Sequence, residues 1–428
     1  MSKSFISILG TNDYLECYHS FNGKKSDVPV KYIQEDMVKF FCQDFDDNDE
    51  TRIFLTDLAR KTNWENDGFG KPNEGLKSRL KKLELKCKVR DINIPDGNNE
   101  NEIWKIFEII YNTFQKDENL IVDITHSFRF LPMILTTLLN YAKYTKNILV
   151  KGIYYAAFES LGTYNEVKNI PIEQRIVPIF DLTSLSKLQD WTVASFDFIQ
   201  NANVATLKKL VNNERYYEKG NYLPGKVIEK LEELILNIAL CRGNELVKFN
   251  YDEIKSQILK LKNIEALTKP FYYLIDELYK KIQNFSNDIN VLVLQIAEWC
   301  FEHNYYQQMV TLLQEFSITL VLKANNLDIT KRGFREIVSQ AFRIYGEKIP
   351  EESWKSPAKD NPHITQKILE TKLLSNLSSP FQSITEIRND VNHSGFLENA
   401  RNVNRLRKKL RKILDDFKEK ITFNNHLT

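Results

Sequence analysis

The sequence lacks the features that mark several common protein classes. Its five cysteines lie far apart and form no C-x-x-C pair, which argues against zinc ribbons and redox motifs and fits a reducing compartment. No run of about 18 apolar residues occurs, so we expect no transmembrane span. The first residues lack the apolar stretch of a signal peptide. We therefore expect a cytoplasmic protein.

A strong charge of either sign is also missing. The 59 Lys and Arg residues nearly balance 57 Asp and Glu residues, giving a formal net charge of +2. Any attraction to nucleic acid must then come from local patches. The acidic stretch at 44–50 is interpreted as a solvated loop rather than a metal site, and we expect no metal site elsewhere.

Nucleotide-cofactor motifs are absent as well. The chain has no G-x-x-x-x-G-K-[ST] loop, no H-E-x-x-H and no G-x-G-x-x-G after its first strand pattern. The nearest match, Gly68-Phe69-Gly70, lies in a polar stretch. A conventional NTPase or NAD enzyme is therefore disfavoured, and we expect no cofactor.

Short apolar runs and helical patterns alternate over the first 182 residues. The strand candidates lie at 5–10, 52–57, 87–94, 119–125, 150–158 and 175–182. Helical patterns lie between them, for example at 103–114 and 130–144. This alternation predicts a parallel sheet with helices on both faces, a doubly wound Rossmann-like fold. Such sheets bind ligands at the carboxyl ends of their strands.

The strand pattern stops after Leu182, and only helical patterns follow. We predict three segments: a Rossmann-like sensor at 1–182, a helical connector at 183–285 and an all-α domain at 286–428.

A polar loop, Gly10-Thr11-Asn12, directly follows the first strand. Glycine lets a ligand approach the backbone closely, and the Thr and Asn side chains can bond a phosphate, ribose or base. A plain turn explains the same residues equally well.

A second polar loop, Asp123-Ile-Thr-His-Ser-Phe-Arg129, leaves the strand at 119–125. It places Thr125, His126, Ser127 and Arg129 where a parallel sheet binds ligands, and an arginine there suits a phosphate. This density of polar groups favours ligand binding. The alternative is that Asp123 and Thr125 only stabilise a turn while His126 is an interior imidazole.

The two loops together closely resemble those of CARF sensor domains, in particular of the CARF–HEPN ribonucleases attached to type III CRISPR systems. The resemblance implies a sensor that binds a cyclic oligoadenylate across a homodimer interface, and we expect the tetra-adenylate as the activator. The contact residues that it implies are Gly10, Thr11, Asn12, Thr125, His126, Ser127 and Arg129.

The all-α segment contains Arg388-Asn389 followed by His393. On one helix Asn389 and His393 share a face, and neither Arg388 nor His393 belongs to the apolar stripe. A histidine near a helix carboxyl end has its protonated form favoured, which suits a general acid. The alternative is a solvated basic helix end with a capping histidine. The apolar stripe itself consists of Phe381, Ile384, Ile387 and Val391.

The spacing R-N-x-x-x-H resembles the HEPN ribonuclease pattern. The resemblance implies a metal-independent endoribonuclease that cuts single-stranded RNA, with Arg388, Asn389 and His393 of two protomers forming one composite site. The 2′-OH of the RNA would be the nucleophile, giving a 2′,3′-cyclic phosphate and a 5′-OH. The alternative function is a ligand-responsive, non-catalytic regulator whose helical half binds nucleic acid or dimerises.

Two further features of the helical half allow two interpretations each. The pattern at 401–421 places an apolar stripe on one face of a helix and basic residues on another, which is either an RNA track or a solubilising surface. Tyr306 and Gln308 either line a groove where bases stack or pack between helices. The basic residues are Arg405, Arg407, Lys408, Lys409, Arg411 and Lys412.

Overall fold

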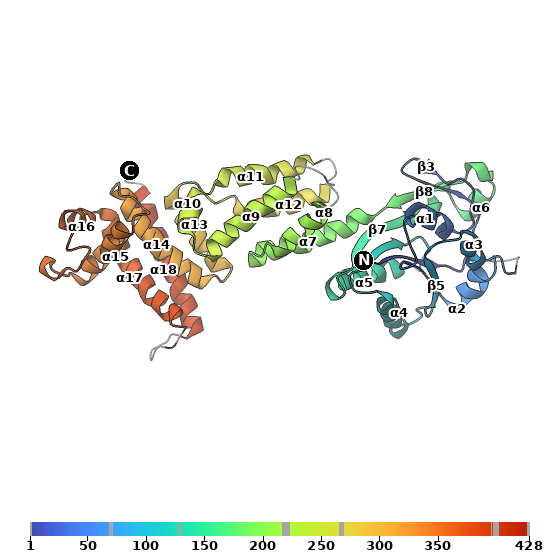
Figure 1. The fold of residues 1–428 in the computed structure, drawn as a ribbon, viewed down its shortest axis with the longest axis horizontal. Coiled ribbons are helices and arrows are strands. Elements are labelled where there is room, and N and C mark those ends of the chain that lie inside the picture. Colours follow the sequence, from blue (N-terminus) through green and yellow to red (C-terminus); the bar gives the residue numbers. More distant parts are fainter. Residues whose placement is uncertain are drawn as a thin grey trace. The chain divides into compact units, whose positions relative to one another are not determined.

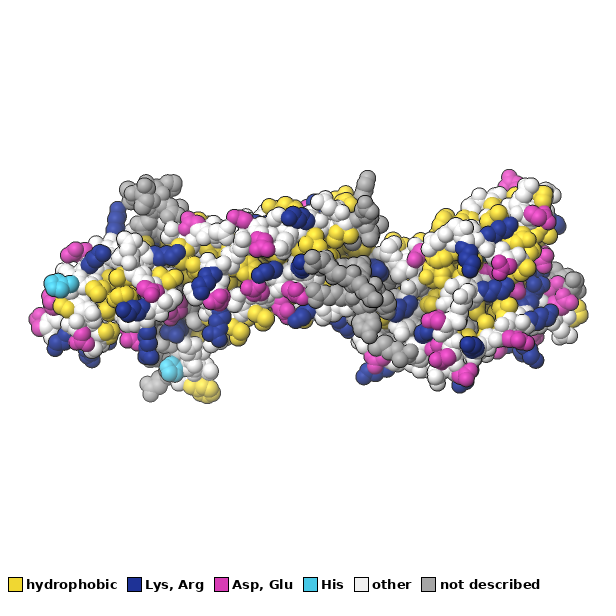
Figure 2. Space-filling view, turned by 45° about the horizontal axis from the view of Figure 1, so that its top comes forward, with side chains coloured by type: hydrophobic (Ala, Val, Ile, Leu, Met, Phe, Trp, Pro, Cys, Tyr) yellow, Lys and Arg dark blue, Asp and Glu magenta, His cyan; other side chains and the backbone are white. Residues whose placement is uncertain are grey.

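The computed structural model describes residues 2–67, 72–126, 130–215, 223–264, 269–394, 396 and 402–425. The chain forms two compact units, Met1–Gln189 and Asp190–Thr428, and the boundary falls within helix α7 (Thr183–Asn201) (Figure 1). Acidic and basic side chains are interspersed over the surface in Figure 2, in keeping with the small net charge. Within the described ranges no helix is both long and apolar enough to cross a bilayer.

The first unit is built on an eight-stranded sheet with the order β3-β2-β8-β7-β6-β1-β4-β5. All six predicted strands form, and the five strands from β7 to β5 in this order run parallel. The expectation of an entirely parallel sheet is wrong at β8, which runs antiparallel to β7, and at β3. The strands are β1 (Lys3–Leu9), β2 (Tyr18–Phe21), β3 (Lys24–Lys25), β4 (Glu50–Leu55), β5 (Lys88–Asn93), β6 (Asn119–Asp123), β7 (Leu149–Ala156) and β8 (Ile176–Asp181).

Helices cover both faces of this sheet because its central strands are apolar on both sides. In β1, Phe5 and Leu9 pack in the core that includes α1 and α3, while Ile6 and Ile8 pack in the core that includes α4 and α5. The Rossmann-like α/β fold followed by a helical region is thereby confirmed. The elements between the strands are α1 (Ile33–Phe41), α2 (Asp57–Ala59), η1 (Arg60–Trp64), α3 (Leu76–Lys82), α4 (Glu100–Thr113), α5 (Leu131–Thr145), η2 (Phe158–Leu161), α6 (Tyr164–Lys168) and η3 (Ile172–Gln174).

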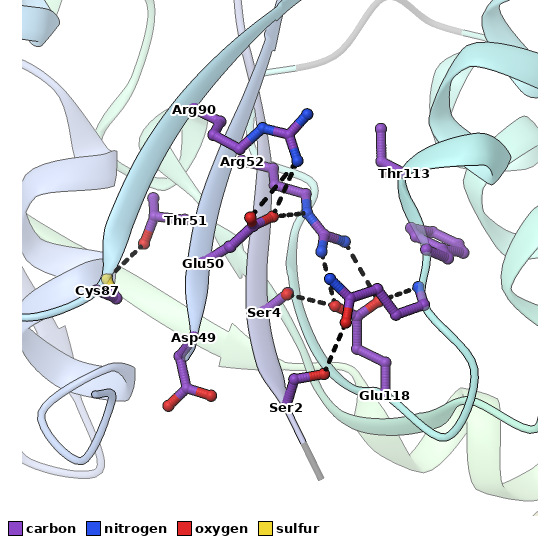
Figure 3. A network of polar contacts seen from close by, with 12 residues as sticks. Ser2, Ser4, Asp49, Glu50, Thr51, Arg52, Cys87, Arg90, Thr113 and Glu118 are labelled. Carbon is purple, nitrogen blue, oxygen red and sulfur yellow. Dashed lines mark hydrogen bonds and ion pairs between the residues drawn. The ribbon is translucent and has the colours of Figure 1, made fainter. Parts of the chain in front are cut away.

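A buried ion pair joins strands at the amino-terminal edge of the sheet (Figure 3). Arg52 of β4 donates to both carboxylate oxygens of Glu118, at 2.8 and 3.2 Å, and both side chains are fully buried. Arg52 also donates to Glu50 at 2.8 Å, and Glu118 accepts from Ser4 Oγ at 2.5 Å. These contacts lie away from the carboxyl ends of the strands and fix the sheet rather than a ligand.

The described residues of the second unit form helices and loops, and its main hydrophobic core includes residues from Ala194 to Ile421. A smaller cluster consists of Ile344, Trp354 and Ala358. The ranges predicted as connector and as all-α domain share this core, and the three-way division of the chain stays a prediction. The helices after α7 are α8 (Ala205–Arg215), α9 (Leu223–Ala239), α10 (Gly243–Lys248), α11 (Tyr251–Lys260), η4 (Leu261–Asn263), α12 (Lys269–Ile282), α13 (Ile289–Glu302), α14 (Tyr306–Ala324), α15 (Arg332–Glu347), η5 (Glu351–Ser353), α16 (Pro362–Leu369), α17 (Lys372–Asn392) and α18 (Val403–Asn425).

Candidate functional site

A cavity of about 650 Å³ opens at the carboxyl ends of β1, β6 and β7 in the first unit. Asn12, Thr125 and His126 line it, and Gly10 lies directly beside the His126 side chain. Thr11 does not line this cavity. Ser127 and Arg129, the other two residues of the second polar loop, lie outside the described residues. The two polar loops therefore meet at one cavity.

Close packing at Gly10 leaves no space for a side chain. A Cβ atom there would lie 2.5 Å from the Tyr14 hydroxyl oxygen and 3.7 Å from Cβ of His126. The Tyr14 ring in turn packs against the His126 imidazole, with the ring centroids 4.3 Å apart. Glycine at position 10 therefore leaves room for the Tyr14 ring beside His126 in the cavity wall. The sequence analysis did not identify Tyr14, although it stands four residues beyond Gly10.

His126 is neutral in the folded protein. Burial, with a smaller contribution from the nearby His19, lowers the pKa of its imidazole to about 3. A neutral ring stacks and forms hydrogen bonds but does not supply a positive charge for a phosphate. Within this loop, only the undescribed Arg129 remains as a cation.

Asp123 and Thr125 hold the second loop in place. Asp123 is buried, accepts from Ser7 Oγ at 2.7 Å and from the Thr125 backbone N–H at 2.9 Å, and its pKa is raised by burial. The Thr125 hydroxyl accepts from the backbone N–H of Ala156 at 3.0 Å, which ties the loop to β7. Both residues thus stabilise the turn, as the structural alternative stated, and Thr125 lines the cavity as well.

Asn63 holds the loop Gly10-Thr11-Asn12 through hydrogen bonds to its backbone. This fully buried side chain of η1 donates from Nδ2 to the carbonyl oxygens of Gly10 and Asn12, each at 2.9 Å. No local pattern in the sequence marks Asn63, because its partners stand more than 50 positions away.

The rim of the cavity carries more hydrogen-bond acceptors than cations. Asp13 accepts from the Tyr164 hydroxyl at 3.0 Å and pairs with Lys31 at 3.2 Å. Lys31 is the one Lys or Arg side chain in the lining among the described residues, whereas Asp13 and Glu159 both line it. Aromatic rings with acceptors beside them suit a heteroaromatic base with exocyclic amino groups.

Arg388, Asn389 and His393 lie together at the carboxyl end of α17 in the second unit. The helix ends at Asn392 with His393 as its C-cap, and the His393 backbone N–H donates to the Asn389 carbonyl at 3.0 Å. Asn389 and His393 are exposed. Arg388 is half-buried, and its buried Nε has no hydrogen-bond partner among the residues that the structure describes. The end of this helix therefore presents an amide, an imidazole and a guanidinium within two turns.

The basic face of α18 is partly engaged in ion pairs. Arg411 pairs with Glu298 at 2.5 Å, and Lys409 pairs with Glu386 at 3.1 Å. These contacts favour the structural interpretation for two of the six basic residues at 405–412.

The first turn of α14 also takes part in packing. Tyr306 meets Phe301 edge to face, with centroids 5.7 Å apart, and Gln308 Nε2 donates to the Ala239 carbonyl at 3.4 Å. These contacts favour the packing interpretation for both Tyr306 and Gln308.

Comparisons with known proteins point to the same family of sensor domains. Residues 5–159 match the family model described as "CRISPR system endoribonuclease Csx1, CARF domain". The CRISPR-associated protein MJ1674 of Methanocaldococcus jannaschii is 24% identical over 301 residues, which are 65% of this chain and 42% of that protein. The chain thus spans less than half the length of this relative. Csm6 of Enterococcus italicus, solved with cyclic hexa-2′-fluoro-hexa-dAMP, is similar with 12% identity and a TM-score of 0.48 over 98% of this chain and 94% of that one. Residues 5–159 are therefore assigned as a CARF domain.

Proposed function

We propose that the protein is a metal-independent endoribonuclease, activated by a cyclic oligoadenylate, that cleaves single-stranded RNA in type III CRISPR antiviral defence. One observation carries the proposal. A CARF domain with a ligand-sized cavity at its strand ends precedes, on the same chain, a helix whose carboxyl end presents Arg388, Asn389 and His393 together.

The cavity of the CARF domain is the proposed activator site. Its volume, its Tyr14–His126 ring pair and its carboxylate acceptors suit an adenosine unit better than an isolated anion. Asn63 holds the backbone of the first loop through two hydrogen bonds, which lowers the cost of ordering this loop when the ligand binds. The proposed contacts with the activator are Gly10, Thr11, Asn12, Thr125, His126, Ser127 and Arg129.

RNA carries its own nucleophile, so the nuclease site needs few groups. The 2′-OH must lose a proton, the phosphorane must be stabilised and the leaving 5′-oxygen must gain a proton. His393 is exposed at the helix end and takes the role of general acid or base. Arg388 stabilises the phosphorane charge, and Asn389 orients the phosphate. The products are a 2′,3′-cyclic phosphate and a 5′-OH.

One chain supplies only one histidine to this chemistry, whereas the reaction needs both a base and an acid. Two protomers, each contributing Arg388, Asn389 and His393, provide both. We therefore propose a homodimer whose nuclease site is composite.

The test is RNA cleavage by the purified protein in EDTA, with cyclic tri-, tetra- and hexa-adenylates added separately. We expect cleavage of single-stranded RNA only with one of these activators. We expect His393→Ala to abolish cleavage while activator binding, measured by calorimetry, is unchanged. The matched control is His363→Ala, because His363 is an exposed histidine on α16 away from the helix end.

Two results would contradict the proposal. Cleavage that survives His393→Ala, or that requires a divalent metal, would refute the mechanism. Tight activator binding without any cleavage would instead support a ligand-responsive regulator.

A further inference from the structure

His19 of β2 is a buried side chain in the wall of the sensor cavity. It is only 5% exposed, and the same wall contains Cys17, Ile33 and Val177. Val177 of β8 is the residue paired with His19 in the sheet. Side chains alternate between the faces of a strand, so His19 lies on the same face as Cys17, which packs in the core that includes α1. His19 is therefore the polar group in an otherwise apolar part of the wall.

The carboxylate of Asp36 fixes the orientation of the His19 ring. His19 Nδ1 lies 2.8 Å from Oδ2 of Asp36 on α1, and the Asp36 side chain is fully buried. Lys39 Nζ lies 3.6 Å from the other carboxylate oxygen, so a cation faces the carboxylate on that side. A carboxylate only accepts hydrogen bonds, so Nδ1 of His19 carries a proton and donates to Asp36. The contact thus sets both the tautomer and the orientation of the ring.

Helix α1, which carries Asp36, is itself held against the sheet. The buried Gln34 of α1 donates from Nε2 to Ser7 Oγ at 3.0 Å and to the Ile8 carbonyl at 3.2 Å. Both acceptors belong to β1, the strand that leads into the first polar loop. The hydrogen bond between Asp36 and His19 therefore joins two elements that are each fixed in the sheet unit.

Nε2 is the polar atom of the His19 ring that remains for a ligand. It has no hydrogen-bond partner among the residues that the structure describes, although the ring lines the cavity. With the proton on Nδ1, the neutral ring offers Nε2 as an acceptor. An acceptor in an apolar wall discriminates between ligands, because a ligand without a matching donor leaves the acceptor unpaired.

We propose that His19 is a specificity-determining residue of the cavity and that its Nε2 accepts a hydrogen bond from the exocyclic amino group of an adenine. The apolar side chains beside His19 suit the flat face of a base better than a phosphate. Guanine carries a carbonyl group at the position of the adenine amino group and has no hydrogen to donate there. The choice of a cyclic oligoadenylate as ligand rests on the proposed function, whereas the tautomer set by Asp36 does not.

The first experiment determines the tautomer without any ligand. Two-bond ¹H–¹⁵N correlation spectra are recorded on the full-length protein with ¹⁵N-labelled histidine at about pH 8, above the usual titration range of imidazole. The His19 signal is assigned by its loss in His19→Gln. We expect a protonated Nδ1 and an unprotonated Nε2. A proton on Nε2 in this spectrum would overturn the inference.

The second experiment measures the preference for the amino group by calorimetry. The ligands are cyclic tri-, tetra- and hexa-adenylate and, for each ring, the counterpart with purine riboside, which lacks the 6-amino group. His19→Asn keeps an amide N–H for Asp36 and removes the ring edge that carries Nε2. We expect this substitution to reduce the preference for the adenylate over its counterpart at least about fivefold. Ile33→Val changes an apolar side chain of the same wall and should leave the preference unchanged.

The possible results separate this inference from the proposed function. If none of the three cyclic adenylates binds the unaltered protein, both are refuted. If one binds and His19→Asn keeps the full preference, the role of His19 is refuted and the proposed function stands.

A third measurement decides the question if His19→Asn does not fold or binds neither ligand. In the unaltered protein, the Nε2 resonance of His19 should shift when the adenylate binds and should shift less when the purine counterpart binds. Equal shifts would overturn the inference.

Discussion

The buried pair of Arg52 and Glu118 allows a quantitative prediction about the stability of the sensor unit. We consider Arg52→Met and Glu118→Gln, each of which removes one charge of a pair that has no exposure to solvent. Breaking a buried ion pair from one side costs about 3–5 kcal/mol, because the remaining charge loses its partner in a medium that solvates it poorly.

The remaining hydrogen-bond partners of Arg52 and Glu118 predict which of the two substitutions costs more free energy of unfolding. After Glu118→Gln, Arg52 still donates to Glu50 at 2.8 Å, so the cost should lie near the lower limit, about 3 kcal/mol. After Arg52→Met, the buried Glu118 carboxylate keeps only neutral donors, Ser4 Oγ and the Gln115 backbone N–H, so the cost should approach about 5 kcal/mol. The double substitution Arg52→Met/Glu118→Leu should recover most of the loss, since no charge is left buried.

The measurement must resolve the sensor from the helical unit, because a chain of two units need not unfold in one step. Hydrogen exchange at increasing urea, read on peptides from β1, β4 and β6, gives the local free energy of unfolding. Asp44→Asn removes the solvent-accessible pair with Lys3 and should cost less than about 1 kcal/mol. The reasoning is refuted if Glu118→Gln costs more than Arg52→Met, or if both cost less than the Asp44→Asn control.

Three further predictions concern the cavity. Gly10→Ala should displace the Tyr14 ring and raise the activator concentration for half-maximal cleavage at least about tenfold. The control is Gly333→Ala, because a Cβ atom at position 333 would meet open space. Equal effects of the two substitutions would contradict this account. Asn63→Ala should raise the activator concentration for half-maximal cleavage by a similar factor, because the first loop loses two hydrogen bonds. It should also lower the free energy of unfolding of the sensor by about 1–3 kcal/mol, measured by hydrogen exchange in urea. An unchanged activation curve would contradict the role of Asn63. Between pH 6.5 and 5 only the unfolded chain protonates His126, so sensor stability should fall by up to about 2 kcal/mol, and His126→Gln should flatten this pH profile.

The sequence predicted the sheet because short apolar runs mark its strands. On β1, Phe5 and Leu9 pack in one core and Ile6 and Ile8 in the other, and such a run marks a strand buried on both faces. The strand β2 was missed because it has only four residues, one of them buried. The predicted direction of β8 was wrong because an apolar run predicts a strand but not whether the strand pairs parallel or antiparallel with its neighbour.

The sites were predictable only as far as their residues are neighbours in the sequence. The loops after β1 and β6 are short polar motifs, and so is the Arg388–His393 segment. Asn63 could not be identified because it acts on residues more than 50 positions away, and no periodicity reports such a contact. Long-range side-chain contacts depend on the fold, so they could be assigned only once the fold was known.

The shared core of the second unit limits how this protein can be recombined with others. A chimera joined at the predicted 285/286 boundary would cut through one hydrophobic core and leave apolar helix faces exposed on both halves. A chimera joined inside α7 would break a helix whose Thr183 hydroxyl accepts from a backbone N–H of β7, while its Ala194 and Phe198 belong to the helical core. Exchanging sensors among such proteins therefore requires that α7 be transplanted whole, with the residues on both of its ends matched to their new surroundings.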